Sequence, residues 1–244
     1  MAARKKIALV TGVSRKEGLG FAIASRMAAA GIDVILTARD IDKAKALAQQ
    51  IDTGENLVFP LALDVSNEPM VMQLAELIKS SFGGLDILIN NAGGVFDAGV
   101  NVLETDFTTT HEAFELNLFG AWRMIKFCLP LLQQRDAARI INISSGAGTF
   151  SDPHFGMAHH PSLVPSYALA KLALNGLTVK MAAALLPYKI DVNAVDPGFV
   201  ATYPGTKEMG AIDPAVAVED IFWVTNLPAG TTGNLYKNRK QTGW

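Results

Sequence analysis

The chain has 244 residues, a length that suits one α/β domain with a large hydrophobic core. Apolar residues make up 50% of it and charged residues 18%, and the formal net charge of −2 excludes the basic footprint of a nucleic-acid-binding protein. The single cysteine, Cys128, excludes an internal disulfide, and with no secretion signal and no apolar run long enough for a bilayer we expect a cytoplasmic protein.

The N-terminal part of the chain predicts a strand, a glycine-rich turn and a helix in succession. Residues 7–10 form a continuous apolar run, typical of a strand buried on both faces, and apolar residues at helical spacing follow from Leu19 until Gly31. Glycines in the turn at residues 11–20 let the backbone bend tightly and let a pyrophosphate approach the amides of the helix start. The turn is therefore a predicted phosphate-binding site, with an ordinary turn as the alternative on this stretch alone.

The end of the second strand bears on the choice of dinucleotide. This strand is predicted at residues 33–37, and Ala38 and Arg39 follow it. In a dinucleotide-binding fold, an acidic residue at this point binds the ribose hydroxyls of NAD, whereas a cation accommodates the 2′-phosphate of NADP. Together with Arg15 and Lys16 in the first turn, Arg39 favours NADP(H) over NAD(H), although Asp40 comes directly after it. The alternative is a solvated charge cluster on a loop.

Strands and helices alternate along the rest of the chain. Further strands are predicted at residues 57–63, 85–89, 138–143, 190–195 and 232–236. Helices are predicted around residues 43–51, from a cap at Ser66 to residue 83, through residues 114–125, at 166–186 and from Asp213 to Asn226. Such short connections give right-handed crossovers. We therefore expect an α/β fold, a Rossmann-type doubly wound parallel sheet of about seven strands, in a single domain over residues 1–244.

The helix at residues 166–186 carries a pair of side chains that suit acid–base chemistry. Tyr167 and Lys171 lie one helical turn apart and share a face. A tyrosine hydroxyl has a pKa of about 10, and a nearby ammonium is expected to lower the pKa of Tyr167. Tyr167 is then a candidate general acid for a carbonyl oxygen, with Ser145, at the end of the fifth strand, as a second donor. Because a Tyr-x-x-x-Lys pair also arises by chance, this assignment depends on the glycine turn and the strand-end serines as well.

Taken together, these motifs resemble the short-chain dehydrogenase/reductase family over essentially the whole chain. The match rests on Thr11-Gly12, Gly18-Leu19-Gly20, Asp64-Val65, Asn90-Asn91-Ala92-Gly93, Asn117, Ser144-Ser145, Tyr167-Ala-Leu-Ala-Lys171, Asn193 and Pro197-Gly198 through Thr202. Residues 36–40 and the ending at residues 233–244 are most similar to the carbonyl reductase type. The resemblance implies an enzyme that reduces a ketone or an aldehyde with NADPH, with Tyr167 as the general acid.

The resemblance also implies roles for individual residues. The catalytic tetrad would be Asn117, Ser145, Tyr167 and Lys171, with Ser144 as the alternative serine. Lys171 would also bind the nicotinamide ribose, and Asn117 would hold a water that links Lys171 to solvent protons. The implied cofactor-binding residues are Gly12, Ser14, Arg15, Lys16, Gly18, Leu19, Gly20, Arg39, Asp64, Val65, Asn91, Ala92, Gly93, Tyr167, Lys171, Pro197, Gly198, Val200 and Thr202.

Three features depart from the family pattern. The glycine turn is two residues longer than usual, because residues 13–17 occupy the gap. The interval from Ser145 to Tyr167 is also longer, so residues 150–164 are expected to shape the substrate pocket or a subunit contact. Only residues 203–212 separate Thr202 from the next helix, which predicts a pocket that is open, or roofed by another chain or by the 150–164 loop.

Two other functions remain open at this point. A non-catalytic NADP-binding regulator or scaffold would use the same fold, but the Ser145, Tyr167 and Lys171 side chains favour catalysis, since a sensor needs only the cofactor residues. An enoyl reductase fits the lengthened glycine turn. It is disfavoured because such enzymes are expected to space the tyrosine and the lysine further apart.

The expected partners are a small-molecule carbonyl substrate and further copies of this chain. An apolar substrate pocket is predicted from Val95, Phe96, Phe150, Phe155 and Tyr203. As is common in the family, we expect a homodimer or homotetramer through the helices that carry Asn117 and Tyr167. No nucleic acid, membrane or metal partner is expected, because His154, His159 and His160 have no carboxylate cluster beside them.

Overall fold

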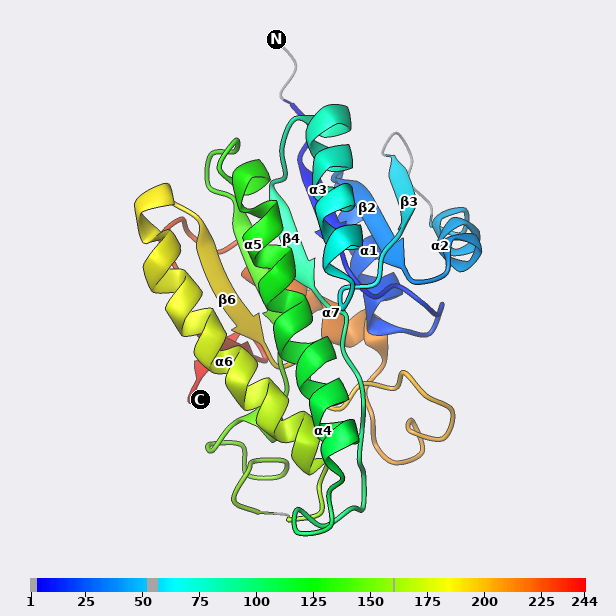
Figure 1. The fold of residues 1–244 in the computed structure, drawn as a ribbon, viewed down its shortest axis with the longest axis vertical. Helices are drawn as coiled ribbons and strands as arrows, with labels where there is room; N and C mark the ends of the chain where they lie inside the picture. The colour runs from blue at the N-terminus through cyan, green and yellow to red at the C-terminus, as the bar shows by residue number, and fades with distance from the viewer. Residues whose placement is uncertain (1–3, 52–56, 160) are drawn as a thin grey trace.

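Eight strands form one sheet in the computed structural model, which describes residues 4–51, 57–159 and 161–244. The strand order is β3-β2-β1-β4-β5-β6-β7-β8, and all neighbours are parallel except β7 and β8 (Figure 1). The strands are β1 (Ile7–Val10), β2 (Asp33–Ala38), β3 (Val58–Ala62), β4 (Ile87–Asn90), β5 (Arg139–Ile143), β6 (Asp191–Val195), β7 (Leu235–Lys237) and β8 (Lys240–Thr242). The order reverses between β1 and β4, as in a doubly wound fold.

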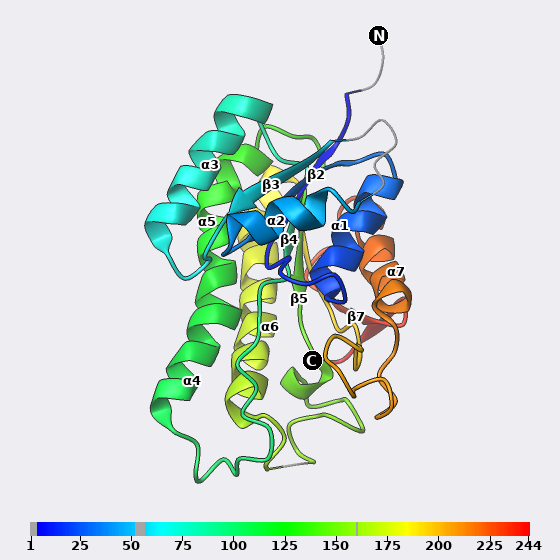
Figure 2. The ribbon, with the colours of Figure 1, turned by 90° about the vertical axis from the view of Figure 1, so that its right-hand side faces the viewer.

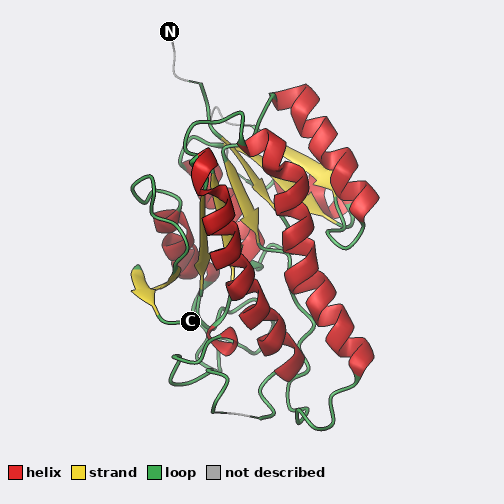
Figure 3. Ribbon diagram, turned by 60° about the vertical axis from the view of Figure 1, so that its left-hand side comes forward, coloured by secondary structure: helices red, strands yellow, loops and turns green. Residues whose placement is uncertain are grey.

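Two layers of helices cover the sheet, on opposite faces (Figures 2 and 3). One layer consists of α1 (Leu19–Ala29), α2 (Ile41–Ala48) and α7 (Pro214–Val224). The other consists of α3 (Glu68–Phe82), α6 (Pro165–Leu185) and a continuous helix made of α4 (Phe107–Phe114), the π-helical η1 (Glu115–Phe119) and α5 (Gly120–Leu132). Short 3₁₀ turns, η2 (Gly146–Gly148) and η3 (Leu186–Tyr188), follow β5 and α6.

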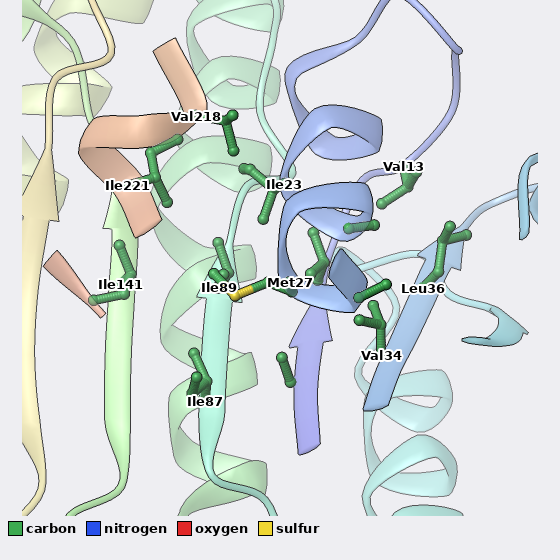
Figure 4. Close-up of a cluster of buried hydrophobic side chains, with 14 of the residues drawn as sticks. Val13, Ile23, Met27, Val34, Leu36, Ile87, Ile89, Ile141, Val218 and Ile221 are labelled. Carbon is green, nitrogen blue, oxygen red and sulfur yellow. The ribbon is translucent and has the colours of Figure 1, made fainter. Parts of the chain in front are cut away.

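Alternate side chains of the strands enter two separate cores. Ala8 and Val10 belong to the cluster beneath α1 and α7, whereas Ile7 and Leu9 belong to the cluster beneath α3 and α5. Figure 4 shows the first cluster, in which Met27 of α1 lies over the sheet. Because both faces of such a strand are covered, its sequence is the continuous apolar run from which it was predicted.

Helix starts differ slightly from the expectations, because neighbouring polar residues compete for the capping position. Asn67 rather than Ser66 caps α3, since its side chain accepts the hydrogen bond from the third residue of the first turn at 3.1 Å. α2 begins before the predicted residue 43, because the Asp40 side chain accepts hydrogen bonds from the amides of Asp42 and Lys43. Both corrections leave the order of elements unchanged.

An eighth strand adds to the seven expected. β8 returns antiparallel to β7 through a tight turn at Asn238 and Arg239, whose φ angles are 52° and 56°. Two successive residues with positive φ make a turn of the type that suits the twist of a hairpin. Asparagine tolerates this conformation but arginine does so rarely, which is why the sequence did not predict the turn.

The longest helix corrects the expectation that no segment is long enough for a membrane. Together with η3, α6 makes a 24-residue segment, Pro165–Tyr188, that is long and apolar enough to cross a bilayer by length and composition. The core helix of a water-soluble protein passes the same test, and α6 packs against β6 and α4. Of its most apolar window, 44% is buried inside the protein.

Candidate active site

The glycine turn after β1 packs against the loop that follows β4. Gly12 has a φ of 74°, and a Cβ on it would lie 2.6 Å from Cα of Ala92. The Asn91 side chain donates to the Thr11 carbonyl at 2.8 Å, and the Thr11 hydroxyl accepts from the amides of Asn91 and Ala92 at 3.0 Å. A Cβ on Gly20 would also lie 2.6 Å from Nδ2 of Asn91. Only glycine therefore fits where the turn packs against this loop, and no side chain caps the start of α1, which leaves its first amides available to an anion such as a pyrophosphate.

Asn117 is fixed by the irregular turn of its helix. It is 1% exposed and lies in η1, where each backbone bond spans one residue more than in an α-helix. Its Nδ2 donates to the carbonyls of Gly94 and Ala113, both at 2.8 Å, and its Oδ1 accepts from the Gly94 amide at 3.2 Å. The side chain thereby ties η1 to the loop after β4. The sequence predicted a polar task for Asn117 but an ordinary helix around it.

Lys171 is buried beside Asn117. It is 3% exposed, and its Nζ donates to the carbonyl of Ile143, at the end of β5, at 2.8 Å. Burial lowers the pKa of Lys171 to about 7. A Cβ on Gly93 would lie 2.8 Å from Oδ1 of Asn117 and 3.3 Å from Nζ of Lys171, so these two side chains meet at the same glycine.

The side chains of Tyr167 and Ser145 lie next to each other in the site. Burial raises the pKa of Tyr167 above its usual range, a hydrogen bond with the Ser145 side chain acts in the opposite direction, and the charge of Asp196 raises the pKa further. This overturns the expectation that Lys171 lowers the pKa of Tyr167. The Nζ of Lys171 lies 5.4 Å from the centroid of the tyrosine ring, and burial, not Lys171, is the main cause of the shift in the pKa of the hydroxyl.

Of the two serines after β5, only Ser145 contacts Tyr167. Its Oγ also accepts from the amide of Ala147 at 3.2 Å, which starts the turn η2. Ser144 is 2% exposed and donates to Oδ1 of Asn175 at 2.5 Å. Asn175 in turn donates to the Gly148 carbonyl at 2.9 Å and so holds η2 against α6. The sequence analysis missed Asn175, whose position two turns after Tyr167 on the same helix was the available signal.

The remaining predicted cofactor residues lie at the carboxyl ends of other strands or after them. The Asp64 carboxylate accepts from the Ser66 amide at 2.9 Å, and Val65 fills the space that a Cβ on Gly120 would need. After β6, Gly198 has a φ of 77°, and the segment returns through a bridge between Val200 and Ile212. Pro197 and Thr202 belong to the same segment.

The predicted cations do not all point to one place. The guanidinium of Arg15 lies 3.9 Å from the ring centroid of Tyr203, in the short segment before α7. Lys16 is exposed, as is Ser14 in the same turn. Arg39, after β2, is also exposed. The structure therefore places Arg15 on the segment at residues 203–212 and leaves Lys16 and Arg39 open to solvent.

Aromatic side chains stand beside Tyr167. The ring of Phe96 lies 4.6 Å from the ring of Tyr167 and 6.4 Å from that of Tyr203, between centroids. Phe155 lies 6.3 Å from Phe199, and Phe150 is 63% exposed, away from any such contact in the described part of the chain. Phe96 and Tyr203 are thus the predicted pocket residues that the structure brings to the site.

No three histidine, cysteine, aspartate or glutamate side chains are grouped to hold a metal ion within residues 4–51, 57–159 and 161–244. His160, one of the three histidines considered above, lies outside the described residues. Cys128 is buried, and burial raises the pKa of its thiol to about 12, which leaves it protonated and unreactive at neutral pH.

Comparisons with known proteins agree with this geometry. The family model for short chain dehydrogenases matches residues 6–209. The chain is 28% identical to (+)-neomenthol dehydrogenase of Arabidopsis thaliana, over 81% of this chain and 83% of that protein. It is also 28% identical to short-chain dehydrogenase/reductase 1 of Saponaria officinalis, over 98% of this chain and 96% of that protein.

A solved structure supports the fold independently. A crystal structure of a Burkholderia xenovorans protein, described as a short-chain dehydrogenase/reductase, superposes with a TM-score of 0.81 at 24% sequence identity and covers 96% of both chains. Since the family model spans most of the sequence and the sheet has the order that the family's fold requires, this chain belongs to the short-chain dehydrogenase/reductase family of oxidoreductases.

Proposed function

We propose that the chain reduces a ketone or an aldehyde to an alcohol with NADPH, as an enzyme of the carbonyl reductase type. The observation that carries the proposal is the meeting of Ser145, Tyr167 and Lys171 at the carboxyl end of β5, with Asn117 beside Lys171. Such a set serves proton transfer to an oxygen, whereas a protein that only senses a dinucleotide has no need of it.

Tyr167 is suited to donate a proton. Its raised pKa keeps the hydroxyl protonated at neutral pH, so the group is available as an acid. When bound, the reduced nicotinamide supplies a hydride to the carbonyl carbon of the substrate. Ser145, already hydrogen-bonded to Tyr167, is placed to donate to the same substrate oxygen and so to fix it against the phenol.

Lys171 and Asn117 are placed to support Tyr167 after the proton has left. Because the pKa of Lys171 is about 7, its amine exchanges protons near neutral pH. In its charged form it stabilises the phenolate across the 5.4 Å between Nζ and the ring. Asn117 holds the loop at Gly94 next to the buried lysine.

NADP(H) is the proposed cofactor. The glycine turn suits a pyrophosphate, because no side chain caps the start of α1 and its first amides are available to an anion. Asp40 caps α2 with its carboxylate, which favours Arg39 as the group that meets the adenosine ribose. Since Arg15 contacts Tyr203, Arg39 and Lys16 are the stronger candidates for the 2′-phosphate.

An apolar carbonyl compound is the proposed substrate class. Phe96 and Tyr203 make an apolar wall next to Tyr167. A cavity of about 270 Å³ is also lined by Ala147, two residues beyond Ser145, and its other described walls are apolar side chains, prolines and a glycine from Val102, the 155–165 segment and α6. A relative named for neomenthol is consistent with such a substrate.

We further propose a homodimer or homotetramer located in the cytoplasm, with residues 1–244 acting as one dinucleotide-binding and catalytic domain. Large apolar side chains remain exposed on α5 and α6, among them Trp122 and Val179. A chain whose one cysteine is buried and unpaired needs no oxidising compartment.

The proposal is tested by mixing the purified chain with NADPH, or with NADH, and a panel of ketones, aldehydes and quinones, while the reduced-nicotinamide absorbance is followed. We expect oxidation of NADPH with an apolar ketone or aldehyde. Tyr167→Phe should lower kcat by about a hundredfold or more because the proton donor is lost. NADPH binding should fall much less than kcat, because the glycine turn and Arg39, which are also proposed to hold the cofactor, are unchanged.

Other outcomes would redirect the proposal. Tight binding of NADPH without turnover of any carbonyl compound would favour a regulator or scaffold. Turnover of conjugated enoyl compounds alone would favour an enoyl reductase. A preference for NADH that Arg39→Ala leaves unchanged would show that Arg39 does not meet the 2′-phosphate.

A further inference from the structure

We propose that Lys237 is a positioning residue for the catalytic end of β5, holding Ser145 in place through two buried carboxylates. This inference rests on the proposed function of Ser145. Lys237 is the last residue of β7, far from the glycine turn and from α6 in the sequence. It belongs to no motif from which the site was predicted.

The ammonium of Lys237 joins two segments that flank the site. Its Nζ lies 2.5 Å from Oδ2 of Asp152, in the loop between η2 and α6, and 2.8 Å from Oδ2 of Asp196, directly after β6. Both carboxylates are buried, with Asp152 at 7% and Asp196 at 3% exposure. The other oxygen of Asp152, Oδ1, accepts hydrogen bonds from the amides of His154 and Phe155. The Oδ1 of Asp196 accepts from the amide of Gly198.

Both carboxylates lie close to Gly146, the residue next to Ser145. A Cβ on Gly146 would lie 2.6 Å from Oδ2 of Asp152 and 3.1 Å from Oδ2 of Asp196. These are the two oxygens that Lys237 holds. The two carboxylates thus lie close beside Gly146, and one ammonium between them offsets the repulsion of their like charges.

The turn that contains Gly146 transmits this constraint to Ser145. The Gly146 carbonyl accepts from the amide and the hydroxyl of Thr149, at 3.1 and 2.9 Å, and the Ser145 carbonyl accepts from the Gly148 amide at 3.0 Å. The Thr149 hydroxyl also accepts from the Asp152 amide at 3.2 Å. A shift of Asp152 therefore displaces the turn that aims Ser145 at Tyr167.

The C-terminal hairpin is attached to the same loop at a second place. The amide of Phe150 donates to the carbonyl of Trp244 at 3.2 Å, and the Ser151 hydroxyl donates to the carbonyl of Gly243 at 2.7 Å. The end of the chain thus lies along the loop after η2. Lys237 is the charged link in a contact that joins the last residues of the chain to the catalytic strand end.

The test compares Lys237→Met with the wild type and with Lys240→Met, a control at an exposed position of β8. Without the ammonium, Asp152 and Asp196 repel and move away from Gly146. We expect kcat for the carbonyl substrate to fall roughly ten- to a hundredfold. KM and NADPH binding should change little, and Lys237→Arg should recover most of kcat, because it restores a cation between the carboxylates.

Amide hydrogen exchange gives a second readout that does not depend on turnover. Peptides over residues 144–157 should exchange faster in Lys237→Met than in the wild type or in Lys240→Met. If Lys237→Met does not fold, Asp152→Asn decides, since it keeps the side-chain shape and removes one of the two ionic contacts. Asp152→Asn should show the same losses in a milder form.

Two results would overturn the inference. One is a folded Lys237→Met with wild-type kcat, and the other is unchanged exchange over residues 144–157. If the wild type reduced no carbonyl compound, the proposed function would fail, but the exchange experiment would still show whether Lys237 holds the turn.

Discussion

At the scale of single residues, the site combines two groups whose burial shifts their pKa values in opposite senses. Burial raises the pKa of Tyr167 and lowers that of Lys171 to about 7, so both groups tend toward their neutral forms. A neutral phenol can donate a proton, and an amine that titrates near neutral pH can return a proton to the phenolate. The same shifts carry a cost in folding free energy, which depends on pH.

For Lys171 the sign of this dependence can be worked out. Its pKa falls from 10.5 in the unfolded chain to about 7 in the folded one, so between these values the unfolded state binds more protons. The free energy of unfolding should therefore rise with pH across this window, by up to about 1.4 kcal/mol per pH unit. We expect the difference in the free energy of unfolding between the wild type and Lys171→Met to rise with this slope. Urea titrations at pH 7.5, 8.5 and 9.5, chosen within that window, measure it.

Lys180→Met, on an exposed position of the same helix, serves as the control and should not alter the slope. If the wild-type and Lys171→Met stabilities ran parallel over this range, Lys171 would not be held in its neutral form by burial.

The candidate residues could be picked out from the sequence, but the side chains that surround them could not. Tyr167, Lys171 and Ser145 stand in recognisable motifs, and the structure brings them together. The burial of the Tyr167 hydroxyl, by contrast, depends on Phe96 and on other segments that pack around it, and it reversed the expected direction of its pKa. Contacts between distant segments of the chain leave no pattern at short spacing.

At the scale of elements, the start of α6 determines where Tyr167 stands. Its N-cap residue, Val164, has a φ of 45° and offers no side-chain cap, and Pro165 has no amide hydrogen. The cap comes instead from Asp97, in the loop after β4, whose Oδ2 accepts from the Ser166 amide at 2.9 Å. Asp97 is 8% exposed, and its charge lies at the positive end of the helix dipole.

Asp97→Ala should lower the free energy of unfolding by about 1–2 kcal/mol, because the buried amide at the helix start loses its acceptor. It should also lower kcat, since the residue after Ser166 is Tyr167. Asp97→Asn keeps an acceptor and should lose less of both. Urea unfolding and steady-state kinetics measure the two effects.

Asp106→Ala is the matched control, because Asp106 caps the neighbouring helix α4 through the amides of Thr108 and Thr109. Asp106→Ala should also lower the free energy of unfolding, because a helix loses its N-terminal cap, but it should leave kcat unchanged. Equal losses of kcat in both variants would refute a specific role for Asp97 in placing Tyr167.

The elements themselves were predictable because each carries its own signal. Strands buried on both faces are continuous apolar runs, as at β1 and β4, and Asp213-Pro214 marks the start of α7. Three features escaped: the π-helical turn around Asn117, the cap from Asp97 and the strand β8. The first two arise from hydrogen bonds to other segments, and the third needs an arginine at positive φ.

At the scale of the whole molecule, the helical layer that holds the site also presents an apolar face to solvent. Phe119 of η1 and Trp122 of α5 are 41% and 45% exposed, and Leu169 and Val179 of α6 are 38% and 42% exposed. The continuous helix of α4, η1 and α5 lies beside α6 in this layer and packs on it through α4 and η1 (Figure 1). An apolar face of this kind is typical of a contact between proteins.

We therefore expect a dimer or a tetramer in light scattering coupled to size-exclusion chromatography. Trp122→Glu should shift the protein toward the monomer, because a carboxylate would be buried without a partner in the contact. Val216→Glu is the matched control, since Val216 is 62% exposed on α7, in the layer on the opposite face of the sheet. A monomeric wild type would contradict the expected assembly, and equal dissociation by both variants would place the contact elsewhere than on α5 and α6.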